Sequence, residues 1–241
     1  MNKPSRHPQE RADRAGINPL MHLSPSQMQQ LFAHQGRRPV PMERGFVSGL
    51  LSRISRVPDR LLHNGRRRAV LAALAGAGQA PASVLVICNG NIFRSPFAAA
   101  VLRRSLALRG LGRVRVDSAG FAGPGRPTPL DAVGAAARRG IDLTTHSSQL
   151  VMADVVRAAD LIIVMDAMQR RMICERFGRS PRGVLLLGDF DPLPVTSRGI
   201  EDPVEQGPEV CARVYARIER CVEELAQALA APARAKPAAV P

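Results

Sequence analysis

Short apolar or alternating runs are separated by amphipathic segments through the C-terminal two thirds of the chain. Runs of this length are typical of strands in a buried parallel sheet, and the segments between them have helical spacing. The predicted strands are residues 84–87, 114–118, 161–165 and 184–187. The predicted helices are 95–109, 129–139, 152–159, 167–177 and a last helix with Val210, Val214, Ile218, Val222, Leu225 and Leu229 on one face.

This alternation predicts an α/β domain over residues 84–230. We expect a four-stranded parallel sheet with helices on both faces, as in flavodoxin-like or Rossmann-like folds. Ligands of such sheets bind at the carboxyl ends of the strands. The segment 189–208 is rich in Pro and Gly and has no periodicity, which predicts a long functional loop or lid. The Ala- and Pro-rich tail, residues 231–241, is expected to be disordered.

Residues 1–80 have a different composition and predict a largely disordered N-terminal extension. The first 45 residues are rich in Pro, Gln, Arg and His and lack periodicity. Residues 46–57 have apolar positions at helical spacing and predict an amphipathic helix, which Pro58 ends. Small residues and Pro over 76–83 predict a linker into the domain.

The positive charge is concentrated in this extension. The 241-residue chain has a formal net charge of +14, of which residues 1–80 carry +9. The basic segment is interpreted as a helix that docks on the domain or stays solvated, or as a contact for an acidic partner or membrane surface. Nucleic-acid binding is not expected, because the segment has one aromatic residue and no known binding motif.

The cysteines and the hydropathy pattern exclude several other classes of protein. The four cysteines, at 88, 174, 211 and 221, lack the spacing of a zinc site or of a disulfide framework. We therefore expect neither a metal nor another cofactor. No apolar stretch opens the chain, and residues 69–75 are too few to span a bilayer. The sequence predicts a soluble, cytoplasmic protein.

Candidate chemistry follows the first predicted strand directly. Cys88 is followed by the loop Asn89-Gly90-Asn91-Ile92-Phe93 and then by Arg94 and Ser95-Pro96. Ser followed by Pro is typical of a helix start, so a helix N-terminus should face the loop and form an anion site. Such a site favours a thiolate at Cys88, and Arg94 can bind two oxygens of a tetrahedral oxyanion. The pattern predicts in-line attack on phosphorus; the alternative is a structural Cys and a solvated Arg.

Two residues of this loop have predicted supporting roles. Asn91 tolerates the left-handed backbone that a loop folded around an anion often needs. The Ser95 hydroxyl can donate a hydrogen bond to the thiolate and help it leave in a later step. Both residues are therefore candidate members of the phosphate-binding loop.

A phosphatase of this kind also needs a proton donor for the leaving oxygen. We expect no His near the cleft, because His146 is the one His after residue 63 and lies in a Thr/Ser-rich loop. A carboxylate on a mobile loop is then required. Asp202, followed by Pro203, is the first candidate; Asp189 and Asp191 are alternatives that also fit as turn caps.

From Val84 to about Leu229 the chain resembles the low-molecular-weight protein tyrosine phosphatases, including bacterial members encoded with polysaccharide-export systems. The matching pieces are the segment Cys88 to Pro96, Asp117-Ser118-Ala119-Gly120, Gly140-Ile141-Asp142-Leu143, Asp160 to Asp166 and Asp202-Pro203. The resemblance implies that Cys88 is the nucleophile, Arg94 binds phosphate and Asp202 is the general acid and then base. It also implies a phosphotyrosine protein as substrate, such as a tyrosine kinase of a polysaccharide-export system.

The chain departs from the family pattern at several positions. Phe93 stands where many members have a second Cys, and Val204-Glu205 stand where many have aromatic residues. Related phosphoarginine phosphatases tend to have Thr at the position of Ile92. Two alternatives remain: an arsenate reductase, which needs a pair of redox cysteines, and a phosphate-binding protein without turnover. The extension has no counterpart in the family's usual form, and we expect it to be dispensable for turnover of a small aryl phosphate.

Overall fold

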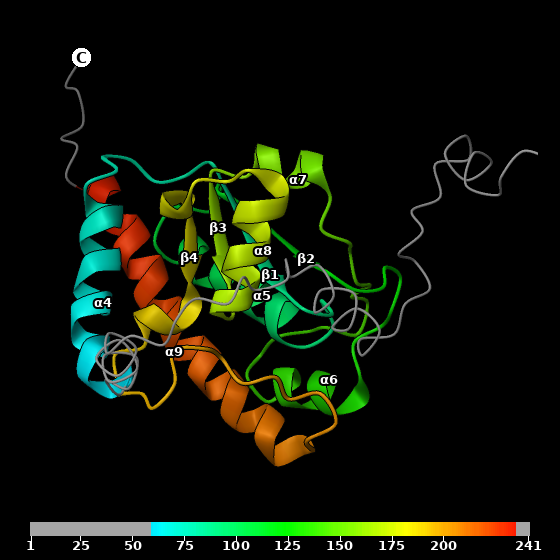
Figure 1. The fold of residues 1–241 in the computed structure, drawn as a ribbon. Coiled ribbons are helices and arrows are strands. Elements are labelled where there is room, and N and C mark those ends of the chain that lie inside the picture. Colours follow the sequence, from blue (N-terminus) through cyan, green and yellow to red (C-terminus); the bar gives the residue numbers. More distant parts are fainter. Residues whose placement is uncertain (1–58, 235–241) are drawn as a thin grey trace, which may run out of the picture. The chain divides into compact units, whose positions relative to one another are not determined.

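The computed structural model describes residues 59–234, which contain a four-stranded parallel sheet (Figure 1). The strand order is β2-β1-β3-β4, and every pairing is parallel. The strands are β1 (Ser83–Cys88), β2 (Arg115–Gly120), β3 (Leu161–Val164) and β4 (Val184–Leu186). The predicted α/β class, parallel sheet and strand positions are confirmed.

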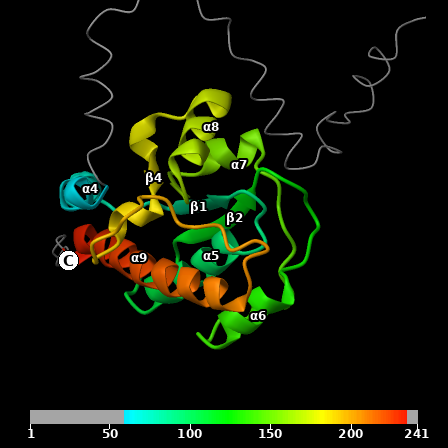
Figure 2. The same ribbon diagram turned by 60° about the horizontal axis from the view of Figure 1, so that its bottom comes forward.

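Helices cover both faces of the sheet, as predicted (Figure 2). One face carries α5 (Arg94–Ala107), α6 (Leu130–Ala137) and α9 (Pro208–Arg234), and the other carries α7 (Ala153–Ala158) and α8 (Ala167–Phe177). Two 3-10 turns, η1 (Pro181–Gly183) and η2 (Leu187–Phe190), flank β4. The central strand β1 is buried at every position, and its side chains alternate between the two cores. This two-sided burial explains the continuous apolar run of its sequence.

Local capping explains why α8 has the bounds that the sequence predicts. The Asp166 carboxylate accepts a hydrogen bond of 2.8 Å from the Gln169 amide, which satisfies a free donor of the first turn. Gly178 ends the helix with φ of 65°, a conformation that favours glycine. The helix α5 differs, because it begins at Arg94 after Phe93 without a side-chain cap. The expected cap, Ser95, has its hydroxyl engaged elsewhere, as described below.

The helix α4 (Asp59–Ala75) lies within the extension predicted to be largely disordered, and it agrees with the interpretation of the basic segment as a docked helix. It lies against α9 and η2, and Val70, Leu71 and Leu74 pack on the main core. Arg67 of α4 forms an ion pair with Glu224 of α9. The predicted helix at 46–57 lies outside the described residues. At the other end α9 continues to Arg234, into the predicted tail, and residues 235–241 are likewise not described.

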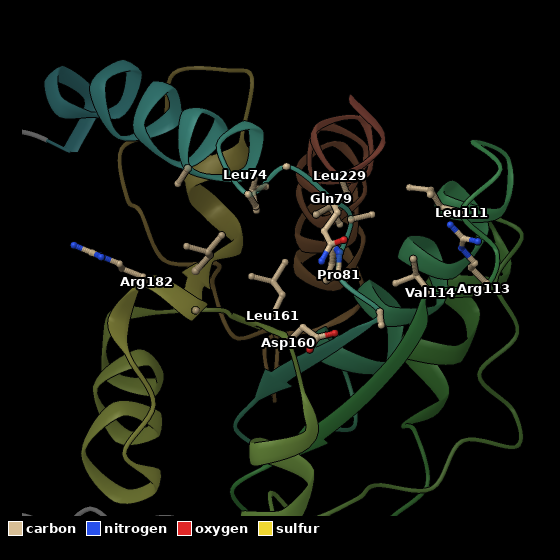
Figure 3. A pocket seen from close by; sticks show the side chains of 17 residues that line it. Leu74, Gln79, Pro81, Leu111, Arg113, Val114, Asp160, Leu161, Arg182 and Leu229 are labelled. Carbon is tan, nitrogen blue, oxygen red and sulfur yellow. The ribbon is translucent and has the colours of Figure 1, made fainter. Parts of the chain in front are cut away.

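A cavity of about 820 Å³ lies where α4 and the connector to β1 meet the first residues of the strands (Figure 3). Leu74, Val114, Leu161 and Leu229 form part of its apolar wall. Cys88 lies at the opposite ends of the strands, so the cavity is separate from the predicted site. Over residues 59–234 no helix is long and apolar enough to cross a membrane. The same residues contain no cluster of three or more His, Cys, Asp or Glu suited to a metal ion.

Candidate active site

Cys88 is the last residue of β1, and its thiol is held inside the loop that follows. The side chain is 2% exposed. Its Sγ lies 3.0 Å from the Ser95 Oγ and accepts a hydrogen bond of 3.2 Å from the Asn91 amide. The sulfur atom is thus held by one backbone donor and lies within hydrogen-bond distance of one hydroxyl.

Asn91 holds the loop in its shape. Its φ is 51°, the left-handed conformation that the sequence analysis expected an Asn to tolerate. The side-chain amide donates to Ser95 Oγ at 2.8 Å and to Ser118 Oγ at 2.9 Å, and its Oδ1 accepts from the Gln149 amide at 2.7 Å. These three bonds use both donor hydrogens of the buried amide and its carbonyl oxygen. The left-handed backbone of Asn91 is thus fixed by Ser118 of β2 and by Gln149 in the segment before α7.

The loop lies so close to β2 that only glycine fits opposite Cys88. Gly120 is the partner of Cys88 in the parallel register. A Cβ at Gly120 would lie 2.7 Å from the Asn91 nitrogen and 2.8 Å from the Asn89 oxygen. Both are backbone atoms, so the loop itself would have to move. The Asp-Ser-Ala-Gly segment of β2 is therefore part of the site.

Arg94 and Asp202 come together from opposite ends of the domain sequence. The Arg94 side chain is 4% exposed and forms an ion pair with the Asp202 carboxylate, which is 38% exposed. A second guanidinium nitrogen donates to the Ile200 carbonyl at 3.0 Å. Arg94 Nε is buried and has no hydrogen-bond partner among the described residues. The guanidinium therefore retains a donor for an oxyanion.

The other predicted loop residues contribute mainly backbone groups. The Asn89 carbonyl accepts from the amides of Phe121 and Ala122, at 2.7 and 3.0 Å. Ile92 is partly buried against the main core, and Phe93 is 5% exposed. The structure thus brings the predicted nucleophile, loop, guanidinium and Asp202 into one region.

Three residues that the sequence analysis did not assign to the site hold the loop from outside. His146 Nε2–H donates to the Asn91 carbonyl at 2.7 Å, so the expectation that no His lies near the cleft is wrong. Arg126 donates to the Gly90 carbonyl at 2.8 Å. Tyr215 donates to the Phe93 carbonyl at 3.1 Å. All three side chains donate to backbone carbonyls of the loop. Because every residue has a backbone carbonyl, the local sequence gives no sign of these contacts.

Tyr215 is fixed by the core around it. Its ring stacks on Phe97 of α5, with centroids 3.9 Å apart and an interplanar angle of 2°. Burial raises the pKa of its hydroxyl, with the neighbouring Cys211 adding to the effect. The hydroxyl therefore stays a proton donor to the loop.

Asp189 and Asp191, the alternative acids, are paired with arginines inside the protein. Asp189 is 1% exposed, and both of its oxygens accept from Arg198 at 2.6 Å. Asp191 is fully buried and accepts from Arg217 at 3.0 Å and from Arg220 at 2.9 Å. Burial alone would raise the pKa of the Asp191 carboxyl, but the hydrogen bonds from Arg220 and Leu193 outweigh it and the pKa is lowered. Both carboxylates are enclosed in these pairs, whereas the carboxylate of Asp202 is 38% exposed.

The other cysteines are not arranged as a redox pair with Cys88. Cys211 and Cys221 are buried on α9, where burial raises the pKa of Cys211 to about 11 and raises that of Cys221 further. Cys174 packs against the core on the other face of the sheet from the one that contains Cys88. All four are free thiols. This placement disfavours the arsenate reductase alternative.

Comparison with known proteins identifies the class of this fold and site. A family model described as low molecular weight phosphotyrosine protein phosphatase matches residues 83–235. The probable phosphatase EpsP of Ralstonia solanacearum is 35% identical over 142 residues, which are 58% of this chain and 91% of EpsP. Wzb of Escherichia coli K12, a low molecular weight protein-tyrosine-phosphatase, is 31% identical over 148 residues, which are 61% of this chain and 95% of Wzb.

Solved structures agree with this assignment. The tyrosine phosphatase AmsI of Erwinia amylovora matches with a TM-score of 0.56 and 28% identity, over 62% of this chain and 93% of AmsI. The YwlE arginine phosphatase of Geobacillus stearothermophilus matches with a TM-score of 0.53 and 29% identity, over 60% of this chain and 90% of YwlE. The protein is thus a phosphatase by class. It belongs to the low molecular weight phosphotyrosine protein phosphatase family.

Proposed function

We propose that this enzyme hydrolyses phosphotyrosine through a cysteinyl-phosphate on Cys88. The Cys88 thiolate attacks phosphorus, the bond to the tyrosyl oxygen breaks, and Asp202 gives its proton to the departing oxygen. Asp202, now a carboxylate, then takes a proton from water as the water attacks the cysteinyl-phosphate. Inorganic phosphate leaves and the thiolate is restored. The observation that carries the proposal is the ion pair of Asp202 with Arg94, which brings a distant carboxylate to the loop that follows Cys88.

Arg94 and Ser95 are proposed to stabilise the charges that this reaction develops. Arg94 has a buried Nε–H without an acceptor among residues 59–234, and its guanidinium can donate to two equatorial oxygens of the transferring phosphoryl group. Asn89 to Phe93 are proposed to surround the phosphate. Ser95 Oγ, 3.0 Å from Cys88 Sγ, can donate to the thiolate when it is the leaving group. The loop therefore serves both half-reactions.

Phosphotyrosine is favoured as the substrate by the named relatives and by Ile92. EpsP, Wzb and AmsI are described as tyrosine phosphatases, whereas YwlE is described as an arginine phosphatase. Ile92 is partly buried at the loop, and a bulky aliphatic side chain favours a flat aromatic ester. Val204, 43% exposed directly after Asp202-Pro203, is proposed as an apolar wall of the pocket. We further propose a cytoplasmic phosphotyrosine protein as partner, such as a tyrosine kinase of a polysaccharide-export system.

The test is a phosphopeptide panel with phosphotyrosine, phosphoserine, phosphothreonine and phosphoarginine, assayed with and without EDTA. Phosphotyrosine should be hydrolysed fastest, and EDTA should not change the rate. Cys88→Ser should abolish turnover and still bind inorganic phosphate, and Asp202→Ala should accumulate a phosphocysteine at Cys88. Undiminished turnover in Cys88→Ser would refute the mechanism, and a preference for phosphoarginine would refute the substrate assignment.

A further inference from the structure

The helix α4 lies outside the part of the chain that matches the family, yet its first residue is bonded to the segment that leads to Asp202. The family match begins at residue 83, and α4 spans Asp59–Ala75. Asp59 Oδ2 accepts a hydrogen bond of 3.0 Å from the backbone amide of Arg198. Asp59 Oδ1 accepts a hydrogen bond of 2.6 Å from the side chain of Arg66, which lies two helical turns further along α4. The bond from Arg66, and then the bond from Arg198, lower the pKa of Asp59, so the carboxylate stays charged.

A second residue of α4 contacts the start of the same segment. His63 is 2% exposed, and its Nε2–H donates to the Asp191 carbonyl at 2.7 Å. The Asp191 carboxylate is in turn fixed on α9 by Arg217 and Arg220. Asp59 and His63 lie one helical turn apart, on one face of α4. The helix thus holds residues 191 and 198 together.

The segment continues from Arg198 to Asp202 through further bonds. The Arg198 guanidinium is paired with buried Asp189, and Arg217 donates to the Gly199 carbonyl at 2.8 Å. The Ile200 amide donates to the Met165 carbonyl at 2.8 Å, and the Ile200 carbonyl accepts from Arg94. Asp202 follows two residues later. A displacement at Arg198 would therefore be transmitted to the carboxylate that faces Arg94.

We propose that Asp59 and His63 are positioning residues that place Asp202 for proton transfer. The inference rests on the proposed function, because α4 can contribute to catalysis in this way only if Asp202 is the general acid. A carboxylate that is displaced by about 1 Å costs a large factor in rate, whereas phosphate binding at the loop needs no proton. The extension is then needed for full activity, contrary to the expectation from the sequence that it is dispensable for turnover of a small aryl phosphate. The part of the extension that forms α4 helps to position the general acid.

The test compares two small substrates in the full-length chain. Phenyl phosphate has a basic leaving group that needs a proton, and p-nitrophenyl phosphate has a stable phenolate that needs it much less. In Asp59→Ala/His63→Ala, kcat/KM for phenyl phosphate should fall about tenfold, a part of the 10²–10⁴ that a general acid contributes. The value for p-nitrophenyl phosphate should change about twofold or less by the same argument.

Matched variants separate positioning from a merely structural role. Leu61→Ala removes an exposed side chain of the same helix, 73% exposed, and should leave both substrates unchanged. His63→Gln keeps an N–H donor and should recover the phenyl phosphate rate relative to His63→Ala. An equal loss on both substrates, or no recovery by Gln, would overturn the inference.

Asp202→Asn provides the reference for the proposed function itself. In Asp202→Asn, kcat/KM for phenyl phosphate should fall further relative to that for p-nitrophenyl phosphate than it does in the double variant. If Asp202→Asn discriminates and the double variant does not, α4 has no positioning role and the proposed function stands. If Asp202→Asn fails to discriminate, the assignment of Asp202 as acid fails first.

Discussion

Arg94 and Asp202, 108 positions apart, form an ion pair at the end of the loop that follows Cys88. The guanidinium is 4% exposed and the carboxylate 38% exposed, so the pair joins a buried group to one that solvent reaches. The group proposed to bind phosphate is therefore in direct contact with the group proposed to protonate the leaving oxygen. An oxyanion at the loop competes with Asp202 for Arg94, which couples substrate binding to the position of the acid.

Neutralising Asp202 should therefore strengthen oxyanion binding while it weakens catalysis. In Asp202→Asn the inhibition constant for inorganic phosphate should tighten about fivefold, because a partly exposed ion pair is worth about 1 kcal/mol or less. Turnover of phenyl phosphate should fall by about 10²-fold or more. Competitive inhibition and initial rates measure the two effects.

The neighbouring carboxylate offers a control of the same charge. Glu201 pairs with exposed Arg213, away from Arg94, so Glu201→Gln should change neither quantity. Weaker phosphate binding in Asp202→Asn would contradict the competition between oxyanion and carboxylate.

The loop and sheet could be predicted from the sequence because their signals are local. Buried parallel strands are apolar on both faces, and the helix that follows Cys88 starts within one residue of its predicted position. A docked helix was among the interpretations of the basic segment, but the bounds and contacts of α4 could not be predicted because the groups that fix it are remote in sequence. His63 contacts Asp191, 128 positions away, and no local pattern encodes that hydrogen bond.

The same distinction separates the predicted site residues from those that were missed. Cys88 to Ser95 are contiguous, and the need for a proton donor led to Asp202. The residues that hold the loop, Arg126, His146 and Tyr215, contact it from 36, 55 and 122 positions away. All three donate to backbone carbonyls, which any residue supplies, so sequence spacing says nothing about them.

Gly120→Ala should inactivate the enzyme while the fold persists. The added Cβ meets backbone atoms of Asn89 and Asn91 at less than 3.0 Å, so the loop must shift. A shift of about 1 Å costs on the order of 100-fold in kcat/KM. Gly134→Ala in α6 is the matched control, because its Cβ meets only the Arg138 side-chain end, at 3.7 Å. Kinetics and circular dichroism of both variants test this, and a fully active Gly120→Ala would refute the close approach.

Peroxide should inactivate the enzyme irreversibly. Phe93 stands where a second Cys would trap the sulfenic acid of Cys88 as a disulfide, so oxidation should continue to the sulfinic acid. Cys174 packs on the other face of the sheet, and Cys211 and Cys221 are buried thiols on α9 with raised pKa values, so none of the three should substitute. Activity after peroxide and then dithiothreitol, with mass spectrometry of Cys88, measures the outcome. Full recovery by the thiol would show that a resolving partner exists.

Asp191 should make the stability of the domain depend on acid pH. Its pKa is lowered in the folded protein, so its contribution is fully present above the unfolded pKa of about 3.9 and is lost as pH falls through the folded pKa. Asp191→Asn leaves Arg217 and Arg220 without their buried carboxylate, which costs about 3–5 kcal/mol near pH 7. The difference between wild type and variant should shrink below about pH 4, where wild type also loses the charge.

Urea unfolding of both proteins at a series of pH values measures that difference directly. Asp154→Asn is the control, because Asp154 is exposed in the first turn of α7 and its loss should cost about 1 kcal/mol or less. Other carboxyls with lowered pKa values, Asp59 and Glu223, titrate in both proteins and cancel in the comparison. If the difference in unfolding free energy stays constant from neutral to acid pH, Asp191 stabilises the fold through packing rather than through its charge. That result would contradict an electrostatic role for its pairs with Arg217 and Arg220.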